Sequence, residues 1–459
     1  MSVAATGAGV PATHGGPAPP DSPADGDGQR GSGGAARWRS RLTLGTTPGR
    51  LRLALIALVT ASLAWGALAG FTVSQYSSAA TSVVTTSEPL TLDAQQIYHD
   101  LSDANDTAAT AFLDGGLQPF SLVSRYQADV NAASSAIEQA TALGGGSPDL
   151  VTLSENLPVY TGEIETARAD NRLGYPLGAA YLREASGLMN GTLLPAAQRL
   201  YAADNSRLTA TSAQATGLPL MLVTILVGLA IGYALYRTSR WLTRRTNRVL
   251  NAGLVAAGLA GAISLVWLAV AFIGAHSDLL TAQSRGSVPV QALARADIVA
   301  LQAHADESLT LIDNTGDDQY QTDYVARQKA LGPGSGTLLA AATSAAAGSP
   351  AASSVSAAAA HATAWNTAHV KLRTADDSGN HTAAVASALG TGPGEAGAEF
   401  AAFSAAMTNG INADQAAFAA SASAGGNMYG GLEAATIVLA LLMAAGCAWG
   451  LSRRLVEYQ

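Results

Sequence analysis

The sequence predicts an all-α membrane protein with four transmembrane helices and two extracytoplasmic antiparallel helical bundles. Three observations support this fold class: four long apolar stretches without a charged residue, an uneven division of basic and acidic residues around them, and helical spacing of apolar residues elsewhere. Only 13 % of the 459 residues are charged, against about 25 % in soluble proteins. The composition therefore argues against a compact soluble enzyme and against a highly charged disordered chain.

The four apolar stretches have the length of membrane-spanning helices. Crossing the hydrocarbon core takes about 20 apolar residues, and only a helix satisfies all its backbone groups within one span. The stretches contain no Asp, Glu, Lys or Arg and cover residues 53–73, 218–236, 253–273 and 434–451.

The first span also carries Ala67-Leu68-Ala69, which resembles a signal-peptide cleavage site. Its apolar run is longer than a signal core and about fifty residues precede it, so an uncleaved anchor is favoured while cleavage stays open.

Charge predicts the orientation of the spans. The two long segments between spans contain 12 basic and 29 acidic residues, whereas the short flanks contain 13 basic and four acidic residues. Because basic flanks stay in the cytoplasm, both termini and the loop 237–252 are predicted on the cytoplasmic side of the cell (plasma) membrane. The long, acidic segments are predicted outside, where their negative charge disfavours binding of nucleic acid.

Both long segments read as helical bundles. In the first, apolar residues recur at helical spacing, and Gly or Pro residues separate expected helices at 88–114, 120–143, 149–172 and 176–216, with a possible kink at Gly217 and Pro219. The aspartates of the first helix fall mostly between its apolar positions, which predicts an amphipathic helix. In the second segment, helices are expected at 287–314, 317–331, 336–347, 351–375 and 395–424.

The second half of the chain resembles the first. The first and third spans begin 200 residues apart, and five residues outside the membrane recur in the same register, which indicates a parallel internal duplication: Pro89, Ala94, Leu101, Asp106 and Thr110 match Pro289, Ala294, Leu301, Asp306 and Thr310.

The predicted domain order has ten segments. They are a disordered cytoplasmic tail at 1–36, a basic juxtamembrane segment at 37–52, the four spans given above, bundles at 74–217 and 274–433, a basic cytoplasmic loop at 237–252 and a cytoplasmic tail at 452–459.

No catalytic residue, cofactor site or metal site can be named from the sequence, and we expect a protein that is not an enzyme. The chain has no phosphate-binding loop, dinucleotide turn or His-Glu-x-x-His motif. His361 and His369 could share a helix face, but solvent-facing histidines are the favoured interpretation. The acidic residues Asp313, Asp317 and Asp318 lack the spacing of a calcium loop. Ligand-binding residues stay unknown at this stage.

The densest charge feature is the loop between the second and third spans. In the favoured interpretation, this loop does no more than fix the membrane topology and contact anionic lipids. In the alternative interpretation, it forms the cytoplasmic output surface. The residues of this candidate surface are Arg237, Arg240, Trp241, Arg244, Arg245 and Arg248. Within the spans, the glycine pairs Gly66/Gly70 and Gly228/Gly232 have the spacing of close helix packing, although compositional drift would produce them equally well.

The layout of four spans, two exported helical domains and an Arg-rich middle loop resembles the GlnX family of actinobacterial membrane proteins across residues 37–459. The resemblance implies that the exported bundles receive an extracytoplasmic amino-acid-binding lipoprotein and that the cytoplasmic side contacts a serine/threonine kinase, kinase G. It carries no site residues over. The layout also resembles the four-helix ligand-binding modules of chemoreceptors and sensor kinases, here used twice.

Two functions are therefore expected. The first is a signal relay that couples an external protein or ligand to a cytoplasmic kinase through helices that cross the bilayer. The second is a structural or accessory subunit of a transporter or cell-envelope complex without ligand chemistry of its own. A homo-oligomer is compatible with both.

Overall fold

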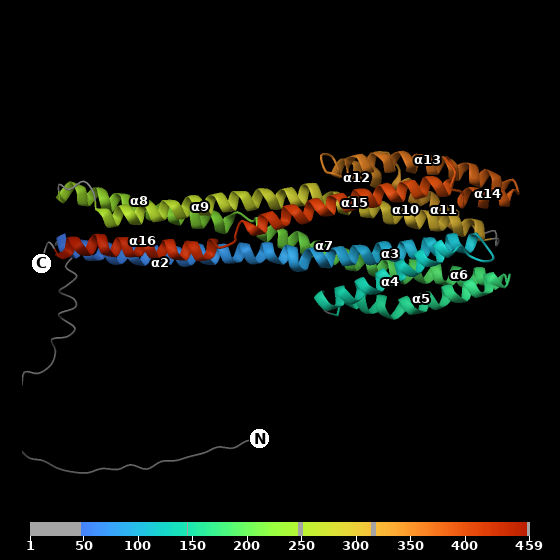
Figure 1. Cartoon of the computed structure of the whole chain (residues 1–459), viewed down its shortest axis with the longest axis horizontal. Helices are drawn as coiled ribbons and strands as arrows, with labels where there is room; N and C mark the ends of the chain where they lie inside the picture. Colours follow the sequence, from blue (N-terminus) through green and yellow to red (C-terminus); the bar gives the residue numbers. More distant parts are fainter. Residues whose placement is uncertain (1–46, 145, 247–250, 314–317, 457–459) are drawn as a thin grey trace, which may run out of the picture.

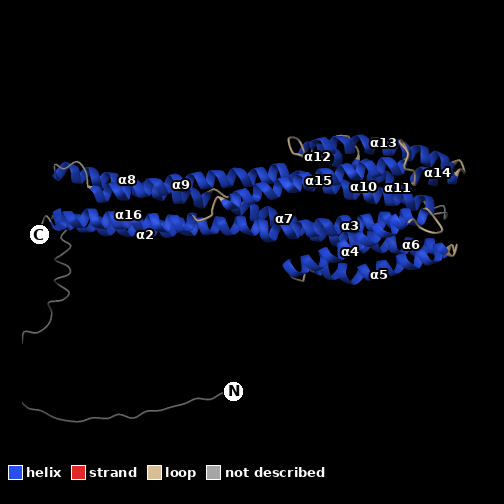
Figure 2. Cartoon of the chain, in the orientation of Figure 1, coloured by secondary structure: helices blue, strands red, loops and turns tan. Residues whose placement is uncertain are grey.

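The protein is a bundle of long helices, and no strand occurs in the residues that the computed structural model describes, which are 47–456 except 145, 247–250 and 314–317 (Figures 1 and 2). The expected disordered tail at 1–36 lies outside this range. The helices are α2 (Thr47–Ser82), α3 (Glu88–Leu113), α4 (Phe120–Gly144), α5 (Pro148–Arg172), α6 (Leu177–Leu188), α7 (Leu194–Thr216), α8 (Pro219–Thr246), α9 (Ala252–Ala282), α10 (Val288–Ile312), α11 (Gln319–Leu331), α12 (Leu338–Ala345), α13 (Ala352–Asp377), α14 (His381–Ala388), α15 (Ala396–Asn427) and α16 (Leu432–Val456).

The molecule is elongated, with one purely helical stalk and two bundles side by side at its far end (Figure 1). The stalk contains α2, α8, α9 and α16, and each of these helices is long and apolar enough to cross a membrane. We call the bundle of α3–α7 module 1 and the bundle of α10–α15 module 2. The predicted all-α fold with four membrane-spanning helices and two helical bundles is confirmed.

The predicted helix positions agree with the structure to within three residues in both modules, and module 2 contains one further helix, α14. The four helices expected between 88 and 216 are present, although the last one is divided by a π-helical turn at Met189–Leu193, η3. The short helix α14 was not predicted, because its eight residues are Ala-rich and carry little apolar periodicity. The expected kink at Gly217 is confirmed, since this residue has extended backbone between α7 and α8.

Each π-helical turn is followed by a proline. The turns η2 (Val83–Ser87), η3 and η4 (Gln283–Ser287) precede Pro89, Pro195 and Pro289, each two residues beyond the turn. Proline has no N–H to donate and its ring crowds the preceding helical turn, so the backbone widens locally and the helix continues. The positions of η2 and η4, 200 residues apart, match the duplication register.

One helix of each half runs unbroken from the membrane into its module. The residues of α2, η2 and α3 form a single helical path, and so do those of α9, η4 and α10. The returning helices are interrupted instead: α7 and α8 are separated at Gly217, and α15 and α16 are separated near Gly431, whose φ is +72°. Each module is therefore joined to the membrane by one continuous and one broken connection.

The membrane helices pack through apolar side chains and a few internal hydrogen bonds. The indole N–H of Trp65 on α2 donates to the carbonyl of Thr224 on α8 (3.0 Å), and the hydroxyls of Thr72 and Thr224 are 2.8 Å apart. The Asn251 amide donates to the Gly450 carbonyl (2.7 Å), which links α9 to α16. Such bonds replace water as partners for polar groups in the bilayer.

Glycines allow the closest helix approaches, but not always the pairs that the sequence indicated. A Cβ atom on Gly253 would lie 2.5 Å from the Gly450 backbone, and one on Gly66 would lie 2.3 Å from the Ala440 Cβ. By contrast, Gly232 and Gly258 have no neighbouring heavy atom within 4 Å of such a Cβ. Helix packing therefore requires some of the membrane glycines and leaves others unconstrained.

We expect Gly253→Val to lower the free energy of unfolding by about 1–3 kcal/mol, because the added carbons meet the α16 backbone, which cannot move aside. Gly258→Val, five residues along the same helix, is the matched control and should have little effect. The measurement is thermal unfolding of the full chain in detergent. Equal melting temperatures for the two variants would contradict the packing that the structure shows.

Candidate ligand-binding cleft between the modules

The two modules meet along α3 and α10, which lie side by side and run in the same direction (Figure 1). The contacts between the two helices follow the same order along both of them: His99 faces Asp297, Asp106 faces His304, and Thr110 lies 3.3 Å from Ser308. Each of these pairs is separated by 198 residues in sequence. The repeated helices thus form a parallel pair within a single chain.

The acidic side of α3 is buried, which corrects the expectation of an ordinary amphipathic helix with its aspartates outside the core. Asp100, Asp103 and Asp106 are each less than a tenth exposed. They are covered because α10 and α4 pack against this side of α3. Sequence periodicity reveals a polar face, but it does not reveal whether water or another module covers that face.

The Asp106–His304 pair is the most enclosed ionic contact between the modules. The Asp106 Oδ1 atom lies 2.5 Å from the His304 Nδ1 atom, and the two side chains are 4 % and 7 % exposed. The imidazole ring stacks on Phe400 of α15 at a centroid distance of 3.8 Å. This aromatic contact fixes the ring plane, so the carboxylate has a defined partner across the interface.

In a second ion pair between the modules, the two helices exchange the roles of acid and base. Here α3 contributes the base, His99, and α10 contributes the acid, Asp297, with 3.1 Å between Nδ1 and Oδ2. Burial works against the charged form of His99, but Asp297, Asp103 and Asp100 overcome it and raise the pKa of His99 to about 9. At neutral pH His99 is therefore a cation, and the two pairs cross the interface in reciprocal directions.

Each module also supplies an arginine from the helix that follows its central helix. Arg125 of α4 forms an ion pair with Asp103 (2.6 Å), and Arg327 of α11 forms one with Asp306. Asp306 occupies the repeat position of Asp106, yet it pairs within its own module while Asp106 pairs across the interface. The repeats have kept the acid and changed its partner.

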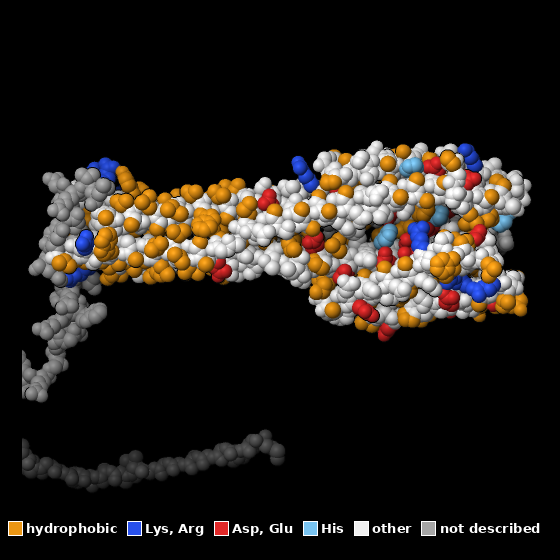
Figure 3. Space-filling model, viewed as in Figure 1, with side chains coloured by type: hydrophobic (Ala, Val, Ile, Leu, Met, Phe, Trp, Pro, Cys, Tyr) orange, Lys and Arg blue, Asp and Glu red, His pale blue; other side chains and the backbone are white. Residues whose placement is uncertain are grey.

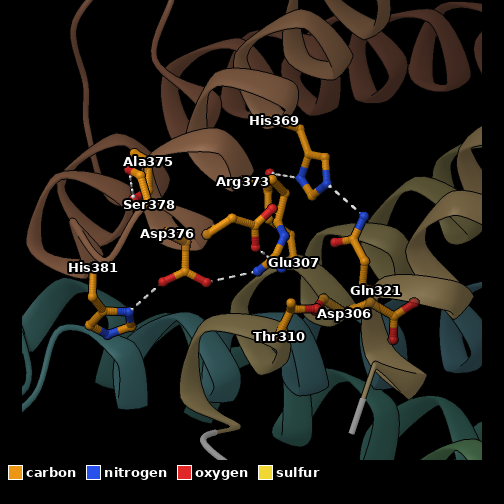
Figure 4. Close-up of polar contacts among 11 residues, drawn as sticks. Asp306, Glu307, Thr310, Gln321, His369, Arg373, Ala375, Asp376, Ser378 and His381 are labelled. Carbon is orange, nitrogen blue, oxygen red and sulfur yellow. Dashed lines mark hydrogen bonds and ion pairs between the residues drawn. The ribbon is translucent and has the colours of Figure 1, made fainter. Parts of the chain in front are cut away.

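A polar network continues into module 2 (Figure 4). Glu307 is 1 % exposed and accepts from the Trp365 indole (2.9 Å), while its other oxygen lies 2.6 Å from His369 Nδ1. The expectation that His369 faces solvent is therefore wrong, because Tyr324 stacks on its ring at 3.6 Å and the side chain is 4 % exposed. His361 is 39 % exposed and pairs with Glu399 (2.9 Å).

Several carboxyl groups here are harder to ionise than usual. Burial raises the pKa of Asp100 to about 6 and that of Asp129, on α4, to about 7, and the charge of Asp103 adds to the Asp129 shift. Burial also raises the pKa of Asp106. An excess of acid in a poorly hydrated interface gives these shifts.

A cavity of about 710 Å³ opens between the modules beside the Asp106–His304 pair. Figure 3 shows the hollow, with acidic, basic and histidine side chains gathered in it. Its polar wall comes from both modules and includes Asp106, Asp114, Arg125, His304 and Thr107, whose buried hydroxyl has no hydrogen-bond partner. The volume and the mixture of apolar and polar walls suit a small-molecule site.

None of the residues around this cleft was predicted as a functional site. The histidines and aspartates are far apart in sequence, and only the repeat register, in which Asp106 matches Asp306, pointed to the central helices. Within the described residues, no group of three or more His, Cys, Asp or Glu side chains could hold a metal ion. Asp317, one of the acids compared with a calcium loop, lies outside the described residues.

The predicted output residues lie at the opposite end of the molecule. Arg237, Arg240 and Arg244 are exposed on the last turns of α8, and their spacing of three and four residues places them on one face. Trp241 is partly buried among them. The Arg245 side chain and the whole of Arg248 lie outside the described residues.

A family model described as an actinobacterial sensor domain matches residues 79–213. The match covers module 1 together with the end of α2, and so includes the α3 side of the cleft. No curated protein matches the chain, and no solved structure does either. The chain therefore contains a region similar to a sensor domain, next to helices that are long and apolar enough to cross a membrane.

We expect Asp106→Asn to destabilise the protein by about 3–5 kcal/mol, because it leaves the buried His304 without its counter-ion. Asp377→Asn is the control, since it breaks an exposed pair with Arg373, and such pairs contribute less than about 1 kcal/mol. Chemical denaturation of the full chain followed by Trp fluorescence gives both values. A loss no larger than that of the control would contradict the role of the buried pair.

Stability should fall as pH rises from about 5 to 9. Asp100 and Asp129 hold protons more tightly in the folded protein than at the ordinary value of 3.8, so their contribution is lost as pH rises through about 6 and 7. The His99 contribution is complete below its ordinary value of 6.5 and is lost as pH rises through about 9. Melting temperatures measured across this range test the sign.

In the same experiment, Asp129→Asn should flatten the decline between pH 5 and 8, because an amide does not ionise. Glu138→Gln is the control, since Glu138 is exposed on the same helix. A melting temperature that rises with pH in the unsubstituted protein would contradict the assignment.

Proposed function

We propose that this chain is a multi-pass membrane sensor that relays an extracytoplasmic binding event to a cytoplasmic partner. In this proposal the modules lie outside the plasma membrane, and both termini and the Arg-rich loop lie inside. The chain itself carries out no catalytic step.

The observation that carries the proposal is the pair of unbroken helices that join the interface of the modules to the membrane. Binding in or near the cleft that changes how α3 packs on α10 changes the relation of α2 to α9, because no flexible segment intervenes. Helix shifts of 1–2 Å are a known means of signalling across subunit interfaces. The match to an actinobacterial sensor domain supports the same function.

The orientation rests on charge. The described end of α8 carries exposed arginines, whereas the modules are rich in acid. Positively charged flanks are retained in the cytoplasm, which supports the assignment of the modules to the outside.

We propose two partners from the resemblance to the GlnX family: an amino-acid-binding lipoprotein outside and a serine/threonine kinase inside. In this proposal the lipoprotein docks on the outer surface of the modules, and the exposed arginines at the end of α8 suit recognition of acidic or phosphorylated groups. A second copy of the chain is a further candidate within the bilayer.

An accessory role in a larger membrane complex is the second candidate, and one feature favours it. A groove of about 470 Å³ runs between α8 and α9 and is lined by small and apolar residues, among them Gly228, Gly232, Gly258 and Gly261. Small residues allow another transmembrane helix to approach closely. A transporter subunit that co-purifies stoichiometrically would support this alternative.

Cross-linking in intact membranes followed by affinity purification separates the two functions. The relay predicts that a solute-binding protein and a cytoplasmic kinase are recovered with the chain. Recovery of a permease or ATPase without a kinase would instead favour the accessory role and contradict the relay.

The Arg surface can be tested without disturbing topology. We expect a triple Arg→Lys substitution at Arg237, Arg240 and Arg244 to weaken recovery of the cytoplasmic partner several-fold, because lysine keeps the charge but loses the bidentate guanidinium. Arg453→Lys, exposed near the end of α16, is the matched control. Unchanged recovery in the triple variant would mean that these arginines serve only topology and lipid contact.

A further inference from the structure

A second cavity, of about 360 Å³, lies beside the α3–α10 pair, and α15 forms its third wall. It shares Thr408 with the larger cavity, so the two are neighbours along one cleft. Its polar lining consists of two aspartates, one histidine, one threonine and four carboxamides: Asp100, Asp297, His99, Thr408, Gln95, Gln96, Asn412 and Gln415.

The carboxylates of this cavity are buried without enough partners. Asp297 is 1 % exposed, and although its Oδ2 atom lies 3.1 Å from the His99 Nδ1 atom, its Oδ1 atom has no hydrogen-bond partner. Asp100 is 8 % exposed, and its Oδ2 atom also has no partner. Leaving a buried acceptor unsatisfied costs about 1–3 kcal/mol and more for a charged group, so these oxygens indicate a missing donor.

The charge of the cavity lining indicates which kind of hydrogen-bond donor the ligand carries. Two carboxylates face one protonated imidazole, and no arginine or lysine lines the cavity. The remaining polar groups are four carboxamides and the Thr408 hydroxyl, all of which can turn an oxygen inward. A cation with several N–H donors fits this lining, whereas a free carboxylate on the ligand would meet two aspartates and only one imidazolium.

The size of the cavity and its ligand set argue for an organic cation. The volume lies within the range of small-molecule sites, and the two carboxylates with His99 do not form a group that could hold a metal ion. Leu92, Ala294 and Ile411 supply an apolar wall for a hydrocarbon body.

We propose that this cavity binds a small primary amine, with its ammonium group between Asp297 and Asp100 and its hydrocarbon part against the apolar wall. The three N–H donors would satisfy the oxygens that lack partners. The inference gives the proposed sensor a direct ligand, but the binding site does not depend on the relay. Because the cavity is bounded by α3, α10 and α15, occupancy would draw α15 onto the central helix pair.

The test is calorimetric titration of the full chain in lipid nanodiscs with n-butylammonium chloride, and with butan-1-ol as the neutral probe of similar shape. We expect butylammonium to bind at least tenfold more tightly than the alcohol. Asp297→Asn should weaken butylammonium binding at least tenfold. Equal binding of the two probes, or no binding of butylammonium at millimolar concentration, would overturn the proposal.

Two further variants keep the test decisive if Asp297→Asn fails to fold. Asn412→Leu, at an exposed position on the α15 wall, should fold and should also weaken binding, because it replaces an amide of the lining by an alkyl group. Glu138→Gln, exposed on α4 and not part of the cavity lining, should bind like the unsubstituted protein. Unchanged binding in Asn412→Leu together with unchanged binding in a folded Asp100→Asn would place the amine elsewhere.

The two proposals can fail separately. One cysteine can be introduced into the membrane-spanning part of α2 and one into that of α9, and their cross-linking measured with and without the amine. If the amine binds but cross-linking does not change, the binding site is supported and the relay is contradicted. Recovery of both protein partners without amine binding would keep the relay and reject the amine site.

Discussion

The arrangement of the two modules depends on charge buried between α3 and α10. An isolated ion in a protein interior is costly, and breaking one partner from a buried pair costs about 3–5 kcal/mol. Asp106 and His304 are both buried, and Asp297 is buried against the partly exposed His99. Both pairs form only when the two helices lie parallel in one register. Apolar contacts would tolerate several alignments, whereas these pairs select one. The larger cavity of the cleft is lined by the central pair together with α4 and α15, and the smaller cavity by the central pair and α15.

The internal duplication predicted from the sequence would explain why such an interface exists in one chain. The stalk helices α2 and α9 each end in a π-helical turn that is followed by a proline, so α3 and α10 enter the modules in equivalent positions and pack as a symmetric dimer would. The two sides of the interface nevertheless differ. Asp106 faces the other module and Asp306 faces its own Arg327, and the acid of the second pair lies on α10 alone. The cleft is consequently asymmetric, with a large cavity at one position and a smaller one next to it.

The sequence predicted where the helices lie, but it did not predict which of their side chains other helices bury. Gly and Pro separators and apolar spacing located the helices of module 1 within a few residues, because these signals are local. The buried state of Asp100 and His369 was missed, because it depends on helices distant in sequence that cover them. The same holds for the membrane glycines: Gly228 and Gly232 lie four residues apart among apolar neighbours on α8, but only Gly228 faces side chains of other helices, those of Leu265 and Trp65. The site could therefore not be found from spacing, although the repeated acid at 106 and 306 was a usable signal.

The reciprocal ion pairs also limit the motion that can carry a signal. His99 and Asp106 are seven residues apart on α3, as are Asp297 and His304 on α10, so the two pairs lie about two helical turns apart on one face. A slide by one full turn, about 5.4 Å, would break both pairs at once. A shift of 1–2 Å or a small rotation would keep them within reach and still move α2 against α9 through continuous helix. The extended residue at Gly217 and the turn at Gly431 let α8 and α16 stay in place while this happens, because the returning helices are not rigidly joined to the modules. The geometry thus favours a small displacement of the central helices over a large rearrangement of the modules.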